Sequence, residues 1–161
     1  MDTWYAGGTE VVFACGGGIY TSAVDAAKKA NAKVIGVDVD QAGVIAGYAG
    51  VEGMTVTSAM KGLYPTTYDT LSDVILNDNW SKYAGQIATL GLVSADDPEA
   101  NYVQIPMGEG TQWSDSFTQD DYKAMVKDMF DGKITVSNDV SKAPSDFATV
   151  IAVEDQGAIK G

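Results

Sequence analysis

Two glycines and an aspartate give the first chemical signal in the sequence. The apolar run Val11–Ala14 is followed by Gly16-x-Gly18, and Asp38 stands twenty residues further on, at the end of a second apolar run. In dinucleotide-binding proteins, glycines in such a turn admit a pyrophosphate and the distant acid binds a ribose. Position 21, where that fingerprint has Gly or Ala, is Thr21. The incomplete pattern leaves a small oxidoreductase with a nucleotide cofactor open as an alternative.

Other reactive side chains are scarce. The chain has no histidine, the usual general base of serine and cysteine hydrolases and a ligand of most catalytic metals. Cys15 is the only cysteine, so neither an internal disulfide nor a multi-cysteine metal cluster can form. The sequence therefore favours a binding protein over an enzyme, with no catalytic residues, no metal and no cofactor.

The elements that must position Asp38 alternate between strand and helix. Residues 10–15 and 33–38 are short apolar runs typical of strands buried on both faces, and alanines recur at helical spacing in residues 19–30 between them. Strand, helix and strand in this order form a βαβ unit with parallel strands. Ligands of open α/β sheets bind beyond the carboxyl ends of the strands, where the glycine turn and Asp38 fall.

The alternation continues toward the C-terminus. A third strand is expected at residues 54–57 and a helix at residues 64–77. The clearest helix begins after Thr118, an N-cap with Asp121 in the capping position, and ends at Gly132. Further strands are expected at residues 87–93, 102–105, 133–136 and 149–153. The sequence thus predicts an α/β protein built on a parallel βαβ sheet.

Length and charge limit the partners. A chain of 161 residues can bury one core, and it contains no run of 18 apolar residues that could span a bilayer. Twenty-two acidic and ten basic side chains give a formal net charge of −12, which repels phosphate backbones and anionic lipids. We therefore expect no nucleic-acid partner.

Three segments of the chain form a recognisable set. Gly8–Gly18 reads GTEVVFACGGG, Val34–Gln41 reads VIGVDVDQ and Thr55–Lys61 reads TVTSAMK. In matching order and spacing, they resemble the basic membrane protein family, which includes the purine nucleoside receptors of bacterial ABC importers. The first is similar to the family's strand and glycine turn, the second is close to the family pattern VIGVDxDQ, and the third is similar to the stretch that precedes a long helix.

The resemblance implies a periplasmic-binding-protein type I-like fold, of which this chain would supply the C-terminal lobe. Residues 1–57 would form the βαβ core of that lobe, residues 58–92 would cross the hinge and contribute to the other lobe, and residues 93–161 would return. Such proteins are extracytoplasmic lipoproteins anchored to the membrane. The first residues show neither a basic n-region nor an apolar h-region, so the sequence leaves open a cytoplasmic protein or a chain whose beginning is missing.

The resemblance also implies a ligand site for a nucleoside or related solute, bound without chemistry. An ionised carboxylate accepts two hydroxyl donors at once, which suits Asp38 to a ribose. Lys61 matches the family's ribose-binding lysine and can also pair with Asp38. Gly17 and Gly18 would let ligand and backbone approach closely. The structural alternatives are a turn cap for Asp38, a solvated surface position for Lys61 and a plain tight turn at the glycines.

Neighbouring residues are given supporting roles. Asp40 and Gln41 are expected to hold the loop after the second strand. Tyr20 and Tyr64 could stack on a base, but packing is the favoured role at their helical positions.

The implied partners are the solute and, in the full-length protein, an ABC permease. Without the other lobe, the helix from Tyr64 and the strand near Leu90 would expose apolar faces, so we expect the chain to self-associate. A truncated remnant without ligand function is the third interpretation.

Overall fold

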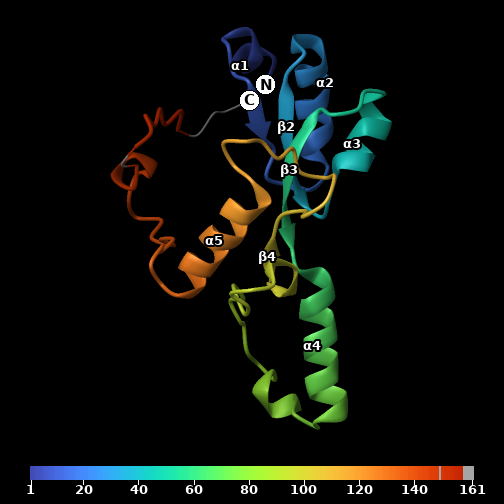
Figure 1. Cartoon of the computed structure of the whole chain (residues 1–161), viewed down its shortest axis with the longest axis vertical. Coiled ribbons are helices and arrows are strands. Elements are labelled where there is room, and N and C mark those ends of the chain that lie inside the picture. Colours follow the sequence, from blue (N-terminus) through green and yellow to red (C-terminus); the bar gives the residue numbers. More distant parts are fainter. Residues whose placement is uncertain (149, 158–161) are drawn as a thin grey trace.

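The sheet has four strands in the residues that the computed structural model describes, 1–148 and 150–157 (Figure 1). Strands β1 (Val11–Phe13), β2 (Lys33–Asp38) and β3 (Thr55–Lys61) are parallel neighbours in that order. Strand β4 (Val103–Gln104) pairs antiparallel with β3 at the other edge. The protein is therefore a mixed α/β protein with an open, mostly parallel sheet, which confirms the predicted α/β class and leaves the periplasmic-binding-protein type I-like fold a prediction.

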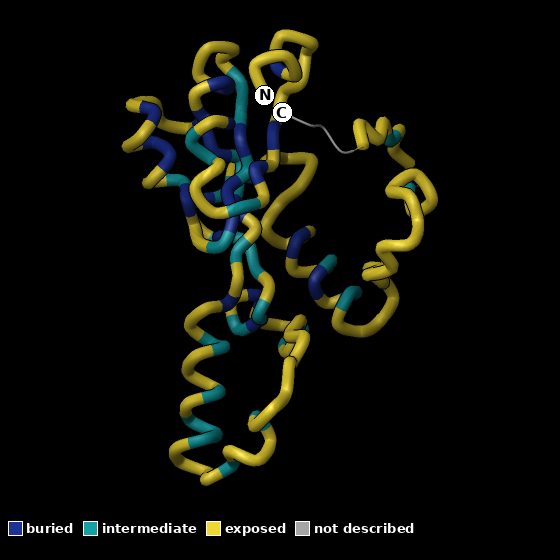
Figure 2. The backbone as a smooth tube through the Cα atoms, turned by 180° about the vertical axis from the view of Figure 1, so that it is seen from behind, coloured by how far each residue is buried: buried dark blue, intermediate teal, exposed yellow. Residues whose placement is uncertain are grey.

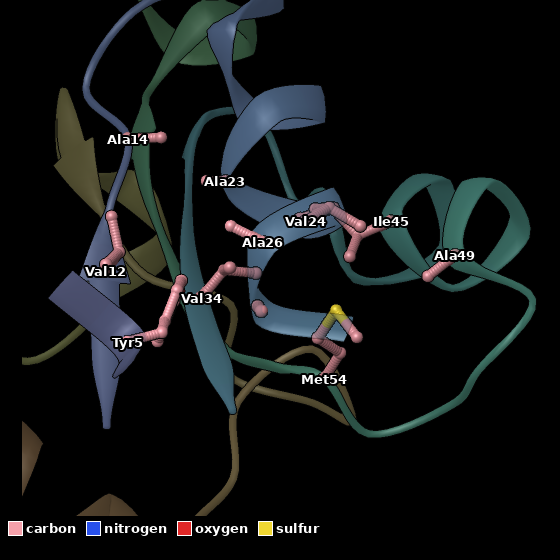
Figure 3. Close-up of a cluster of buried hydrophobic side chains, with 11 residues drawn as sticks. Tyr5, Val12, Ala14, Ala23, Val24, Ala26, Val34, Ile45, Ala49 and Met54 are labelled. Carbon is pink, nitrogen blue, oxygen red and sulfur yellow. The ribbon is translucent and has the colours of Figure 1, made fainter. Parts of the chain in front are cut away.

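Two helices cover one face of the sheet. Helix α2 (Tyr20–Ala30) connects β1 to β2, and α3 (Ala42–Ala49) connects β2 to β3. Figure 3 shows Ala23, Ala26 and Val24 of α2 in one cluster with side chains of β1, β2 and α3. Small alanines let the helix approach the strands closely. The short helix α1 (Asp2–Ala6) joins this core because the Tyr5 hydroxyl donates a 2.7 Å hydrogen bond to the Lys33 carbonyl.

Helix α3 was not expected from the sequence. Its eight residues, AGVIAGYA, have no polar face and contain two glycines, so they lack the helical periodicity that would identify an amphipathic helix. Packing decides the conformation instead, because Ile45 and Ala49 are buried against α2 and the sheet.

Two further helices lie outside this layer. Helix α4 (Leu63–Leu76) continues from β3 and extends away from the sheet, and none of its residues is buried (Figures 1 and 2). Helix α5 (Gln119–Phe130) has Thr118 as its N-cap, and Thr118 and Asp121 form the predicted capping box. Short 3₁₀ turns occupy Gly17–Ile19, Trp80–Lys82, Pro98–Ala100 and Pro144–Asp146.

Several predicted strands are wrong. Residues 87–93 and 133–136 are irregular and are not strands of the sheet, and side chains such as Ile87 and Val136 are exposed. Of the strand predicted at 149–153, residues 150–153 are irregular and Thr149 lies outside the described residues. The first strand is buried on one face only, because Val12 is 5% exposed whereas Phe13 is 47% exposed.

Within the described residues, no helix combines the length and the apolar character that a membrane span requires.

A comparison of two neighbouring residues tests the packing of α3. Ile45 is fully buried and the adjacent Val44 is 53% exposed. We expect Ile45→Ala to lower the free energy of unfolding by about 2–5 kcal/mol, because it leaves a cavity in the core. Val44→Ala serves as the control and should change it by less than about 0.5 kcal/mol. Urea unfolding followed by circular dichroism measures both, and equal effects would contradict the observed orientation of α3.

Candidate functional site

Asp38 ends β2 in a backbone conformation that is unfavourable for a residue with a side chain. Its φ is 71°, and the Val39 N–H donates a 2.8 Å hydrogen bond to the Val37 carbonyl. A hydrogen bond from residue i+2 to residue i around a central residue with positive φ defines the rarer, strained form of the γ-turn. Strained non-glycine residues of this kind concentrate at functional sites.

This turn brings Asp38 to Lys61. Asp38 is paired with Met60 across the β2–β3 ladder, so regular alternation would point the Lys61 side chain to the opposite face. The left-handed turn breaks that alternation at Asp38, and the Lys61 Nζ lies 2.6 Å from the Asp38 Oδ1. The structure thus contains the ion pair that the sequence analysis allowed, at the carboxyl ends of β2 and β3.

A buried polar contact holds the turn in place. The Gln41 Oε1 accepts a 2.9 Å hydrogen bond from the Val37 N–H, and the Gln41 N–H donates a 3.1 Å hydrogen bond to the Ser58 Oγ. A Cβ atom at Gly36 would stand 2.5 Å from that Ser58 Oγ. The absence of a side chain at Gly36 therefore allows Ser58 and Gln41 to join β3 to the turn.

Asp40 contributes to the same loop. Its Oδ1 accepts a 3.0 Å hydrogen bond from the Ala42 N–H at the start of α3. Its carboxylate also fills the space that a side chain at Gly110 would need. Asp40 and Gln41 therefore hold the loop, as the sequence analysis expected.

The charges of the ion pair remain close to solvent. The side chain of Lys61 is 68% exposed and that of Asp38 is 37% exposed. The hydrogen bond to Asp38 raises the pKa of the Lys61 ammonium above its ordinary value, and Cys15 at the end of β1 adds a smaller effect. The carboxyl ends of β1, β2 and β3 thus lie together at one end of the sheet.

Gly17 and Gly18 lie in the 3₁₀ turn between β1 and α2 and are exposed. Gly17 has a φ of 34°, and the Gly18 carbonyl accepts a 3.1 Å hydrogen bond from the Thr21 hydroxyl. Neither glycine is among the residues that line the cavity beside Lys61. The glycines therefore lie beyond the carboxyl end of β1, as predicted, but they do not line the same cavity as Lys61. Their ligand-binding role stays a prediction.

A cavity of about 230 Å³ opens beside the ion pair. Lys61, Val39 and Tyr64 line it together with Glu99 and Gln104 of the returning chain. Glu99 and Gln104 were not identified from the sequence, because only the antiparallel pairing of β4 with β3 brings them to this cavity. Small-molecule sites usually measure roughly 300–1,000 Å³, so this cavity is smaller than a complete nucleoside pocket.

The candidate stacking residues differ in their surroundings. Tyr20 is half-buried and packs edge to face with Tyr48, with 6.2 Å between ring centroids. Tyr64 is 77% exposed and stacks on Tyr68, with 5.7 Å between centroids. Tyr20 therefore has a packing role, whereas Tyr64 presents much of its ring to solvent.

In residues 1–148 and 150–157, no group of three or more histidine, cysteine or acidic side chains is placed to hold a metal ion.

Comparison of the chain with models of protein families gives no match, and comparison with curated proteins gives none either.

The backbone at Asp38 can be tested by comparing two substitutions. Alanine keeps the unfavourable left-handed conformation, whereas glycine removes it, so Asp38→Gly should be more stable than Asp38→Ala by about 1 kcal/mol. Both variants lose the carboxylate equally. At Asp40, whose φ is not positive, the order should reverse, because glycine adds entropy to the unfolded chain. Chemical denaturation of all four variants measures this, and the same order at both positions would argue against the strained turn.

The ion pair predicts a pH dependence. Lys61 should keep its proton to a higher pH than a free lysine, because the Asp38 carboxylate raises the pKa of the Lys61 ammonium above its ordinary value of 10.5. The stabilisation is complete below that ordinary pKa and disappears as the pH rises through the higher pKa of the folded state. NMR titration of the Lys61 side chain should show a fall in its pKa in Asp38→Asn and no change in Asp2→Asn, which breaks a separate surface ion pair with Lys29.

Proposed function

We propose that the chain is a lobe of an extracytoplasmic solute-binding protein with a periplasmic-binding-protein type I-like fold, serving an ABC importer. In this proposal it binds a nucleoside or a related small solute at Asp38 and Lys61, and it does no chemistry. Asp38 accepts hydrogen bonds from the ribose hydroxyls, and Lys61 donates to the ribose oxygens. Gly17 and Gly18 approach the ligand from the neighbouring turn.

The strained turn at Asp38 is the observation that carries the proposal. A glycine would adopt the φ of 71° without strain, yet the position holds a residue with a carboxylate. Within the described part of the chain, the protein partner of this carboxylate is the Lys61 ammonium on Oδ1. Lone pairs are therefore left to accept two vicinal hydroxyls, the hydrogen-bond pattern that a ribose presents.

The surroundings of the ion pair support a ligand that a second protein surface also contacts. The cavity beside Lys61 is open and small, and the ion pair is partly exposed. Periplasmic-type receptors close two lobes around a solute, and the resemblance of the segments around Asp38 and Lys61 to nucleoside receptors fits such a site. We therefore expect weak binding by this chain by itself.

Chemical-shift mapping by NMR detects weak binding and locates it. We expect millimolar adenosine, inosine or uridine to shift the amide signals of residues 37–39 and 61–62. 2′,3′-Dideoxyadenosine should have no such effect, because it lacks both hydroxyls. Asp38→Asn should weaken binding by about tenfold or more, since one hydrogen bond to a charged group contributes about 1.5–3 kcal/mol.

The control and the opposing outcomes are specific. Asp2→Asn removes a carboxylate from another surface ion pair and should leave binding unchanged. Equal shifts with adenosine and its dideoxy analogue would contradict a ribose site. A response to NAD(H) or NADP(H), centred on residues 16–18 and absent with nucleosides, would favour the oxidoreductase alternative. No response to any ligand would contradict nucleoside binding by this chain.

A further inference from the structure

Helix α4 carries an apolar seam that stays more than half exposed in the described structure. The seam consists of Tyr64, Tyr68, Leu71 and Ile75, which are 77%, 58%, 51% and 69% exposed. Their spacing of four, three and four residues is that of the a and d positions of a heptad. The stacked rings of Tyr64 and Tyr68, with planes 15° apart, place these two residues on one face. Such spacing matches the surface of another helix.

Both acidic side chains of α4 are bound by residues outside the helix. Asp69 accepts a 2.9 Å hydrogen bond from the Tyr102 hydroxyl. Asp73 accepts bonds of 2.8 Å from both the Lys82 ammonium and the Tyr83 hydroxyl. In the heptad register, the positions that flank the seam are Pro65, Thr67, Ser72 and Val74. All four are uncharged, so two copies of this acidic chain could bring their seams together without repulsion between flanking residues.

The adjoining chain enlarges the apolar surface. Residues 84–95 contain no charged side chain. Val93 lines a cavity of about 380 Å³ together with Tyr64 and Tyr68, and the acidic residues Asp69, Asp97 and Glu99 line it as well. The four side chains of the seam, at roughly 150 Å² for a fully exposed one, offer on the order of 400 Å² on each copy. Two such seams bury about 800 Å² in total, the size of a weak, transient interface.

We propose that α4 pairs seam to seam and antiparallel with α4 of a second copy of this chain. Residues 62–95 hold three acidic residues and one lysine, so they carry −2 of the net charge of −12 and the rest of the chain carries −10. That acidic body lies at the N-terminal end of α4 (Figure 1). A parallel pair of α4 helices would bring the acidic remainders of the two copies together. An antiparallel pair separates them and aligns the helix dipoles favourably.

The mass of the protein in solution tests the pairing. Sedimentation equilibrium between micromolar and millimolar concentrations should show a dimer in equilibrium with monomers, and added salt should strengthen it because salt screens the acidic bodies. Ile75→Glu buries a charge in the seam and should shift the protein to monomers. Ile151→Glu is the matched control, because Ile151 is also 69% exposed, and it should leave the dimer unchanged.

Disulfide formation tests the orientation. In an antiparallel pair, Tyr64 of one copy faces Ile75 of the other. With Cys15→Ser as the background, a mixture of Tyr64→Cys and Ile75→Cys proteins should form a crosslinked heterodimer on mild oxidation, whereas either protein alone should crosslink poorly. Efficient crosslinking of Tyr64→Cys with itself would show a parallel pair and overturn the proposed arrangement.

Two other results would overturn the pairing itself. A monomer over the whole concentration range would mean that the seam serves another occupant, such as a further part of a longer protein. A dimer insensitive to Ile75→Glu would place the interface elsewhere. Nucleoside binding measured on the monomeric Ile75→Glu variant separates this proposal from the proposed function, because Asp38 and Lys61 are unchanged there.

Discussion

The close contact between β2 and β3 at Gly36 is the constraint on which the rest of this structure depends. With no side chain at Gly36, Ser58 of β3 reaches the backbone of the loop after β2, and Gln41 completes the contact by bonding to Val37. These groups are buried, so each hydrogen bond satisfies a polar atom that would otherwise be costly to desolvate. The contact fixes where β2 ends relative to β3, and with it the position of the Asp38 turn.

The molecule has two parts with different sources of stability. The layer formed by α1, α2, α3 and the sheet has a buried apolar core, in which residues such as Val24 and Ile45 are inaccessible to solvent. The arm formed by α4 and the chain after it has no buried residue in its helix and is held together by polar contacts around Asp73. The hydrogen bond from the Lys82 ammonium, and next in size that from the Tyr83 hydroxyl, holds the pKa of the Asp73 carboxyl well below its usual range. An arm of this kind is suited to packing against another surface.

Much of the fold could be predicted because its signals are local. The alanine spacing identified α2, the capping box located the start of α5, and short apolar runs located β1 and β2. The wrongly predicted strands share one cause. Residues 87–93 and 133–136 have the composition of strands, but a strand forms only where a partner offers hydrogen bonds, and the sequence does not show whether a partner is near. Helix α3 was missed for the converse reason, because its conformation depends on burial rather than on periodicity.

The sequence by itself determined the α/β class, the acidic composition, the scarcity of catalytic side chains and the choice of Asp38 as a candidate, because composition, periodicity and spacing along the chain carry that information. Lys61 became a candidate through the resemblance of Thr55–Lys61 to a known family segment. Only the tertiary structure decided that the two side chains meet, that Glu99 and Gln104 face the same cavity, and that the seam of α4 is more than half exposed. These features depend on the positive φ at Asp38, on the β4 pairing and on the path of α4, and each arises from contacts between residues far apart in the chain.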